Sequence, residues 1–168
     1  MMFLLLISMA AEAQDVGQYL TPEQFLSEAF VAQAPKQEAL WLTKQVAQQA
    51  EKILGHAPMQ LRQHYWKLGD KTAWILDEIG KEEPITAGFV LTAGKVSQVR
   101  IMTYRESRGG EVRYTAFLKQ FQGAGLQDNT LLNRNIDGIS GATLSVSAIS
   151  RMARLALYYD TLSRLESH

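Results

Sequence analysis

Four strand-like runs follow one another in the middle of the chain, and the turns between them are short. Each run is rich in aromatic, β-branched and other apolar residues, a composition typical of strands. Gly69-Asp70 joins the first two runs and Ala93-Gly94 joins the last two, so each pair predicts an antiparallel hairpin. In the last run the apolar residues alternate only in part, which indicates burial on both faces or a bulge. The runs are Arg62–Leu68, Lys71–Ile79, Ile85–Thr92 and Lys95–Tyr104.

Helical signals flank these runs on both sides. Thr21-Pro22-Glu23-Gln24 combines a threonine cap, a proline in the first turn and a glutamine three residues after the cap. Gly55 follows an apolar pattern of helical period and is expected to end a second helix. The helices are predicted at about residues 21–30, 37–54, 114–121 and 144–163.

The order of these elements, a series of strands with helices before and after, predicts an α+β fold. We expect a single domain, with an antiparallel sheet flanked by N-terminal helices and a C-terminal helix, because 168 residues suit one domain. Residues 14–84, the N-terminal helices and the first hairpin, are expected to belong to the same domain as residues 85–164, which hold the motifs described below.

The first thirteen residues differ in kind from the rest. Met1 to Ala10 form an uncharged apolar run too short to span a bilayer, and Ala11-Glu12-Ala13 follows as an A-x-A pattern. We therefore predict a signal peptide at residues 1–13 and a periplasmic or otherwise exported protein. No Lys or Arg precedes the run, and the alternative is an ordinary buried N-terminal segment.

The charge balance and the residue counts exclude several classes of function. Lys+Arg and Asp+Glu number 17 each, which argues against a nucleic-acid partner because such a partner requires a clustered basic surface. The chain has no cysteine, so disulfides, iron–sulfur clusters and c-type haem attachment are excluded. Its three histidines show no metal-ligand spacing, and we expect no metal site. Any redox chemistry must therefore come from an organic cofactor.

The segment Asp137-Gly138-Ile139-Ser140-Gly141-Ala142-Thr143, directly before the last helix, carries the chemical signal. Its small residues let the backbone approach a ligand closely. Its amides and those of the first helical turn form an array of donors at the positive end of a helix dipole, which favours a phosphate. Thr143 is expected at the N-cap, beside that phosphate. The alternative is a glycine-rich loop with a threonine cap and no ligand.

The sequence D-G-I-S-G-A-T resembles the flavinylation motif of the FMN-binding domain family. This family includes the covalently flavinylated subunits of the sodium-pumping NADH:quinone oxidoreductase and of the Rnf complex. The resemblance implies that Thr143 receives FMN through a phosphodiester bond, made by a separate FAD-dependent flavin transferase.

Two further elements of the family precede this motif. Phe117 to Gly123 matches F-x-x-Q-F-x-G. The family's loop, roughly H-x-E-T-P-G-L-G, is matched only in part by Tyr104 to Gly110, because Arg108 stands where proline is expected. The resemblance covers about residues 85–160.

The individual roles that follow are expectations with alternatives. Asp137 would be read by the transferase, or would bond the loop backbone. Ser140 and Ser145 would donate to phosphate oxygens, or would act as caps or be solvated. Arg105 or Arg108 near the flavin N1–C2 edge would stabilise the reduced form, or would be solvated or paired with a glutamate. The residues expected to contact the cofactor are Thr143, Ala142, Gly141, Ser140, Asp137, Gly138, Ser145, Glu106, Ser107, Arg105, Arg108 and Phe121.

Together these features predict an exported electron-transfer flavoprotein. We expect a carrier with one cofactor more than a stand-alone oxidoreductase, because no acid–base pocket is visible in the sequence. Its partners would be the transferase and an unidentified redox donor and acceptor, membrane-bound or soluble. The alternatives are a flavin-dependent sensing or regulatory module, and a scaffold whose loop binds some other phosphate or nothing.

Overall fold

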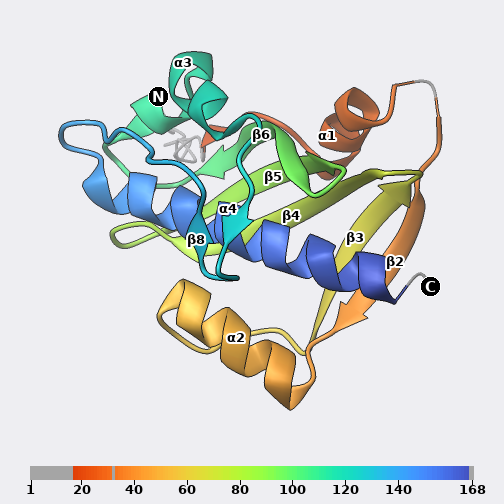
Figure 1. The fold of residues 1–168 in the computed structure, drawn as a ribbon. Coiled ribbons are helices and arrows are strands. Elements are labelled where there is room, and N and C mark those ends of the chain that lie inside the picture. The colour runs from red at the N-terminus through yellow and green to blue at the C-terminus, as the bar shows by residue number, and fades with distance from the viewer. Residues whose placement is uncertain (1–16, 32, 167–168) are drawn as a thin grey trace, which may run out of the picture.

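The structure, a computed structural model, describes residues 17–31 and 33–166, and the predicted signal peptide lies outside the described residues. Its centre is an antiparallel six-stranded sheet in the order β1-β6-β5-β4-β3-β2 (Figure 1). The predicted α+β fold with an antiparallel sheet is confirmed. The strands are β1 (Gly17–Gln18), β2 (Lys36–Trp41), β3 (Arg62–Leu68), β4 (Lys71–Ile79), β5 (Pro84–Thr92) and β6 (Lys95–Tyr104).

The four predicted strands pair as consecutive hairpins, β3 with β4, β4 with β5 and β5 with β6. The imperfect alternation in β6 has a physical cause. The pairing of β5 with β6 shifts register between Thr86 and Ala87 and again between Val90 and Leu91. Each shift leaves one residue of β6 without a partner on β5, so the side-chain alternation restarts on either side of it.

The predicted helix at residues 37–54 is wrong in its first part. The chain forms β2 there, and Lys36–Trp41 pairs with β3 in unbroken register. Helix α2 (Lys44–Leu54) begins only after Thr43, whose hydroxyl accepts a hydrogen bond from the Val46 N–H. The free edge of β3 provides the backbone partners that make a strand of this segment. Gly55 ends α2 in the left-handed conformation, as predicted.

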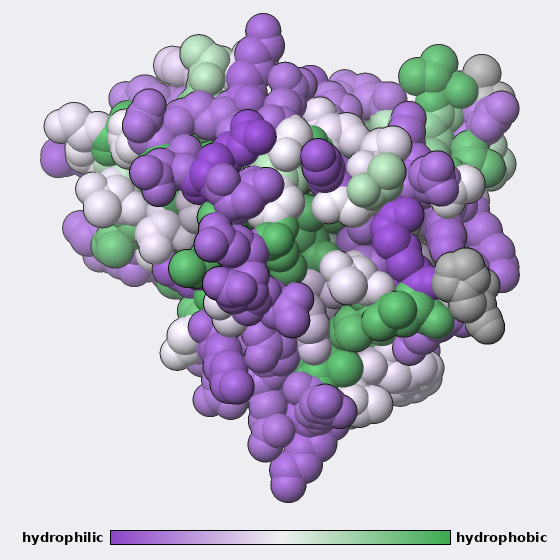
Figure 2. Space-filling view, in the orientation of Figure 1, coloured by the Kyte–Doolittle hydropathy of each residue, from purple (hydrophilic) through white to green (hydrophobic). Residues whose placement is uncertain are grey.

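The two faces of the sheet carry separate hydrophobic cores. Helix α4 (Thr143–Leu165) lies across one face, where the core includes Trp74 and Phe89, and α2 packs beside α4 (Figure 1). Helix α1 (Pro22–Ala29) covers the other face, where it packs on Ala73 and Val90, the neighbours of those residues along each strand. Both helices exploit the alternation of side chains across a sheet. The outer side of α2, at the bottom of Figure 2, is hydrophilic.

Replacing Gly88 by alanine should lower the free energy of unfolding by about 1–3 kcal/mol. A Cβ at this position would lie 2.6 Å from two ring atoms of Phe25, a wholly buried residue of α1. Urea unfolding measures the change. The double variant Gly88→Ala/Phe25→Leu should be less destabilised than the sum of its single variants, because the smaller side chain leaves room. Additive effects would contradict this packing explanation.

The segment between β6 and α4 crosses the end of the sheet in short pieces. They are the 3₁₀ helix η1 (Gly110–Arg113), α3 (Thr115–Leu118), the 3₁₀ helix η2 (Lys119–Phe121), and the two-stranded sheet of β7 (Leu126–Gln127) and β8 (Leu131–Leu132). This path returns the chain to the N-terminus of α4, where the motif lies. Among the residues described, no helix combines the length and hydropathy that crossing a membrane requires.

Candidate functional site

The N-terminus of α4 has no side-chain cap. The N-cap is Ala142, and Thr143 is the first helical residue, so the predicted capping role of Thr143 is wrong. The helix begins one residue earlier than expected because Gly141, at φ 79°, turns the chain into it. In α1 and α2, by contrast, the hydroxyls of Thr21 and Thr43 accept bonds from the first turn. The first N–H groups of this 23-residue helix are therefore left for an outside acceptor.

The space in front of this helix end is open. Thr143 is exposed, and so are Gly138, Ser140 and Gly141. A Cβ added at Gly138 or Gly141 would meet no atom within 4 Å. The loop is nevertheless anchored, because Ile136 and Ile139 pack against the main core. The motif thus presents an accessible hydroxyl and an unoccupied backbone surface on a fixed support, which is what a phosphate-linked group requires.

Gln120 holds the start of the motif by its side-chain amide. Its Oε1 accepts a bond from the Asp137 N–H at 2.7 Å, and its Nε2 donates to the Asp137 carbonyl at 3.4 Å. The side chain of Asp137 is left exposed. Sequence reasoning missed Gln120, although it is the glutamine of the F-x-x-Q-F-x-G element. The contact joins this element to the start of the motif.

The loop after β6 packs directly against the motif. The Tyr104 hydroxyl donates to the Arg108 carbonyl, and it lies 3.0 Å from the Ser145 hydroxyl in the first turn of α4. Since the tyrosine proton is already used, Ser145 donates to the tyrosine oxygen. Burial raises the pKa of Tyr104, and its hydrogen bond with Ser145 opposes that rise. Ser145, expected to contact phosphate, is buried and bonded instead to Tyr104.

Gly109 is the point of closest approach between this loop and the motif. It adopts φ 82°, and a Cβ there would lie 2.8 Å from the Tyr104 hydroxyl oxygen and 3.1 Å from the Ala142 Cβ. Only glycine combines this backbone conformation with so close a contact. The loop and the start of α4 therefore form one packed unit.

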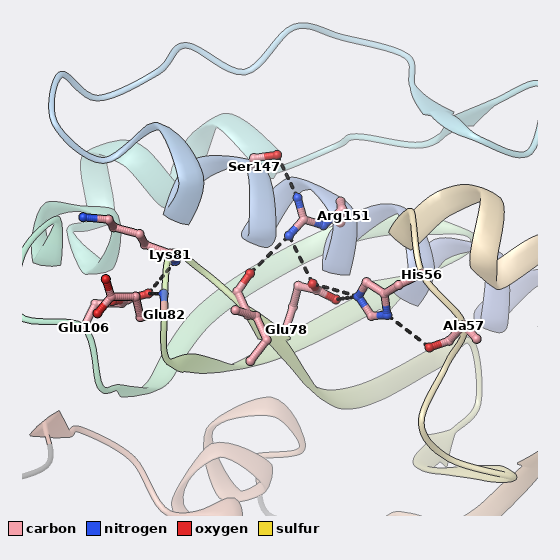
Figure 3. Close-up of polar contacts among 9 residues, drawn as sticks. His56, Ala57, Glu78, Lys81, Glu82, Glu106, Ser147 and Arg151 are labelled. Atoms are coloured by element: carbon pink, nitrogen blue, oxygen red, sulfur yellow. Dashed lines mark hydrogen bonds and ion pairs between the residues drawn. The ribbon is translucent and has the colours of Figure 1, made fainter.

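Glu106 organises the neighbouring β4–β5 turn. One carboxylate oxygen, Oε1, accepts bonds from the N–H groups of Lys81 and Glu82 at 2.5 and 2.7 Å (Figure 3). It also accepts a bond from the N–H of Glu83 at 3.1 Å. Burial raises the pKa of Glu106, but the three N–H groups favour the charged form and the net shift is downward. Gly80 fits between Glu106 and Ser145, where a Cβ would lie 2.9 and 3.5 Å from their side-chain oxygens. The carboxylate of the half-buried Glu106 is thus bonded to the backbone of this turn.

The remaining predicted contacts are placed as follows. The Arg105 guanidinium donates to the Pro84 carbonyl at 2.9 Å and to the Thr86 hydroxyl at 3.1 Å. Ser107 and Arg108 have exposed side chains. Phe121 is wholly buried and packs edge-on against Phe117, with ring centroids 5.7 Å apart. Phe121 therefore supports the site from the core.

An ionic cluster around a buried glutamate adjoins the site two turns along α4. The Glu78 side chain is only 3% exposed and lies between His56 and Arg151 (Figure 3). The Nε2 atom of His56 is 3.0 Å from both carboxylate oxygens of Glu78, and an NH2 nitrogen of Arg151 is 3.1 Å from one of them. Arg151 also donates to the Ser147 hydroxyl at 2.9 Å and to the Ile79 carbonyl. Sequence reasoning did not foresee this cluster, because its members come from three distant segments. It ties the end of β4, and so the turn at Gly80, to α4.

His56 is protonated in this arrangement. Its Nδ1 faces the Ala57 carbonyl at 3.0 Å and its Nε2 faces the Glu78 carboxylate, and both neighbours only accept. Two donors are needed, and only the imidazolium has two. The hydrogen bond with Glu78, followed by that with Ala57, raises the pKa of His56 above its ordinary value.

The folded state should therefore lose stability as the pH rises through this raised pKa. The contribution of His56 is complete below the pKa of about 6.5 in the unfolded chain and disappears above that of the folded one. This contribution to the free energy of unfolding is small because 48% of the His56 side chain is exposed. Chemical denaturation between pH 6 and 9 should show this loss in the parent and in His64→Gln, but not in His56→Gln. Equal pH dependence in all three would contradict it.

Comparison with known protein families gives one match. The model of the FMN-binding domain matches residues 80–158. The matched region runs from the Gly80 turn to Tyr158 in α4, so it includes Gln120, the loop after β6 and the motif. No curated protein matches the chain. Within residues 17–31 and 33–166, no group of three or more His, Cys, Asp or Glu residues is arranged to hold a metal ion.

Proposed function

Because residues 80–158 belong to the FMN-binding domain family, we propose that the protein is an exported electron-transfer flavoprotein whose FMN is esterified through its phosphate to Thr143. The observation that carries the proposal is the exposed Thr143 at the uncapped end of α4, with open space before Gly138 and Gly141. FMN, when bound, supplies the ability to accept and release electrons.

The protein's own residues would bind and orient this group. The free N–H groups of the first turn of α4 would face the phosphate, and the helix dipole favours its negative charge. A diester carries one unit of charge, which this helix end offsets more fully than the charge of a free phosphate ester, about −1.5 to −2. The exposed side chains of Ser107 and Arg108 lie on the loop packed against Ala142, and would be available to contact the ring system.

Attachment would depend on a separate FAD-dependent flavin transferase. A threonine hydroxyl is a weak nucleophile and needs a base. No histidine lies near Thr143 in the sequence, and Asp137 is turned outward with its backbone held by Gln120. The substrate protein would therefore supply an accessible hydroxyl in a fixed loop, and the transferase would supply the base that takes its proton. The Thr143 oxygen would bond to the phosphorus of the FMN part of FAD as the pyrophosphate bond breaks and AMP leaves. Asp137 is the residue best placed for the transferase to read.

Co-expression with a flavin transferase tests the attachment. The intact mass should rise by one FMN less one water, and flavin fluorescence should remain with the acid-precipitated protein. Protein expressed without the transferase should show neither. A colourless protein of unchanged mass after co-expression, with the transferase shown to be active on another substrate, would refute the proposal.

Electron transfer and export each need a separate measurement. The flavinylated protein, once reduced chemically, should pass its electrons to a soluble artificial acceptor, and the flavin absorbance should return. A reduced flavin that no acceptor reoxidises would refute the carrier role.

Cell fractionation tests export. The protein expressed from the full sequence should be found outside the cytoplasm with residues 1–13 removed, whereas a chain expressed without those residues should stay inside.

A further inference from the structure

The outer edge of β6 pairs with no other described strand over four residues. At one end β1 pairs with Thr103 and Tyr104, and the N–H groups of Tyr19 and Leu20 bond the Met102 carbonyl. At the other end Val96 exchanges bonds with Gly123 and Ala124. Between them, Gln98–Ile101 has no strand on its outer side among the residues described. An open strand edge offers backbone donors and acceptors to another chain.

A cavity of about 480 Å³ lies over this gap, within the usual range for binding sites. Val99 and Ile101 form its apolar floor, and η1, α3 and η2 form the opposite wall. The groove is therefore bounded by a free strand edge on one side and by short helices on the other. Its size and shape suit an extended segment of polypeptide.

The lining of the groove is cationic. It includes Arg100, Arg113 and Lys119, and it contains no aspartate or glutamate. Arg100 is paired with Glu28 at 3.4 Å, outside the lining. No carboxylate partner of Arg113 or Lys119 is found in the described part of the chain. Two positive charges in the groove thus have no ionic partner within residues 17–31 and 33–166.

Arg113 is held in place by two tyrosines, which do not neutralise its positive charge. Its guanidinium lies 4.8 Å from the ring centre of Tyr19 and 5.6 Å from that of Tyr114, and it donates to the Tyr19 hydroxyl at 2.6 Å. Both tyrosines are large exposed aromatic residues, 42% and 55% exposed. A preordered cation between exposed aromatic rings is a common element of protein recognition.

We propose that this groove binds an extended acidic segment of a partner protein, which joins the free edge of β6 as an additional strand. Main-chain bonds to Gln98–Ile101 would give affinity, and acidic side chains facing Arg113 and Lys119 would give selectivity. The groove is formed by β6, η1, α3 and η2, and it exists whether or not Thr143 carries flavin. The proposal therefore does not depend on the proposed function.

Fluorescence anisotropy with a capped nine-residue peptide of alternating glutamate and valine tests the proposal. We expect saturable binding that weakens as salt is added. Hydrogen exchange at residues 98–101 should slow in the presence of the peptide. The same peptide with lysine for glutamate, and the glutamate peptide with methylated backbone nitrogens, should both fail to bind.

Charge reversal in the groove supplies the matched comparison. Arg113→Glu/Lys119→Glu should weaken binding by about tenfold or more, whereas Lys44→Glu/Lys52→Glu, an equal change of charge at exposed positions of α2, should not. Thr143→Ala should bind as the parent does, which separates this test from that of the flavin. Absence of binding, equal binding of either control peptide, or unchanged exchange at residues 98–101 would overturn the proposal. A dimer of the protein alone that the double reversal abolishes would overturn it in favour of a second copy as occupant.

Discussion

Replacing Thr143 by alanine should abolish covalent FMN and leave the folded protein as stable as the parent. The Thr143 side chain is exposed, and it is neither the cap of α4 nor a hydrogen-bond partner of any described residue. Alanine is the better helix former by roughly half a kcal/mol. Intact mass after co-expression with a transferase should therefore show no adduct, while the thermal midpoint stays unchanged or rises slightly.

Two matched variants decide which hydroxyl is used. Thr143→Ser keeps a hydroxyl at the same position and should retain part of the attachment. Ser140→Ala removes the other exposed hydroxyl of the motif and should retain most of it. An adduct that persists in Thr143→Ala and disappears in Ser140→Ala would show that the attachment residue is misassigned.

The second large effect is expected from Gly109→Ala. An alanine held at φ 82° costs about 1–2 kcal/mol, and its Cβ would press on the Tyr104 hydroxyl and on Ala142. We expect a total loss of about 2–4 kcal/mol in the free energy of unfolding, and slower flavinylation because the loop is pushed away from the motif. Urea unfolding and the time course of mass gain measure the two effects.

The adjacent glycine is the control for this prediction. Gly110 has no atom within 4 Å of an added Cβ and does not adopt a positive φ. Gly110→Ala should therefore change stability by less than about 0.5 kcal/mol and leave flavinylation unaffected. Equal losses in the two variants would mean that the packing of Gly109 against Tyr104 and Ala142 is not what holds the loop.

The sheet and most helices could be predicted because their signals are local. Short turns between strands, the capping box at Thr21 and the glycine after α2 each act within a few residues. The strand at Lys36–Trp41 could not be predicted, since it is stabilised by pairing with β3, whose partner residues lie 21 to 31 positions away along the chain. The apolar pattern of helical period corresponds to a helix only from Lys44 onward.

The site was predictable as a motif and not as an arrangement. The glycine-rich segment and its threonine are contiguous, so the sequence revealed them together. The bond of Gln120 to Asp137 joins residues 17 apart, and that of Tyr104 to Ser145 joins residues 41 apart. Neither Gln120 nor Tyr104 carries a signal of its partner. The same holds for the cluster of His56, Glu78 and Arg151.

The two bonds of Gln120 to Asp137 limit which side chains can replace this glutamine. The Gln120 amide places its N–H donor opposite the Asp137 carbonyl and its oxygen acceptor opposite the Asp137 N–H. Glutamate would bring two acceptors and face the Asp137 carbonyl with like polarity, and asparagine would be one methylene too short to reach both atoms. Because the Gln120 amide is uncharged, its bonds to Asp137 do not depend on pH or ionic strength. The backbone that carries Thr143 is therefore held in the same position under all of these conditions.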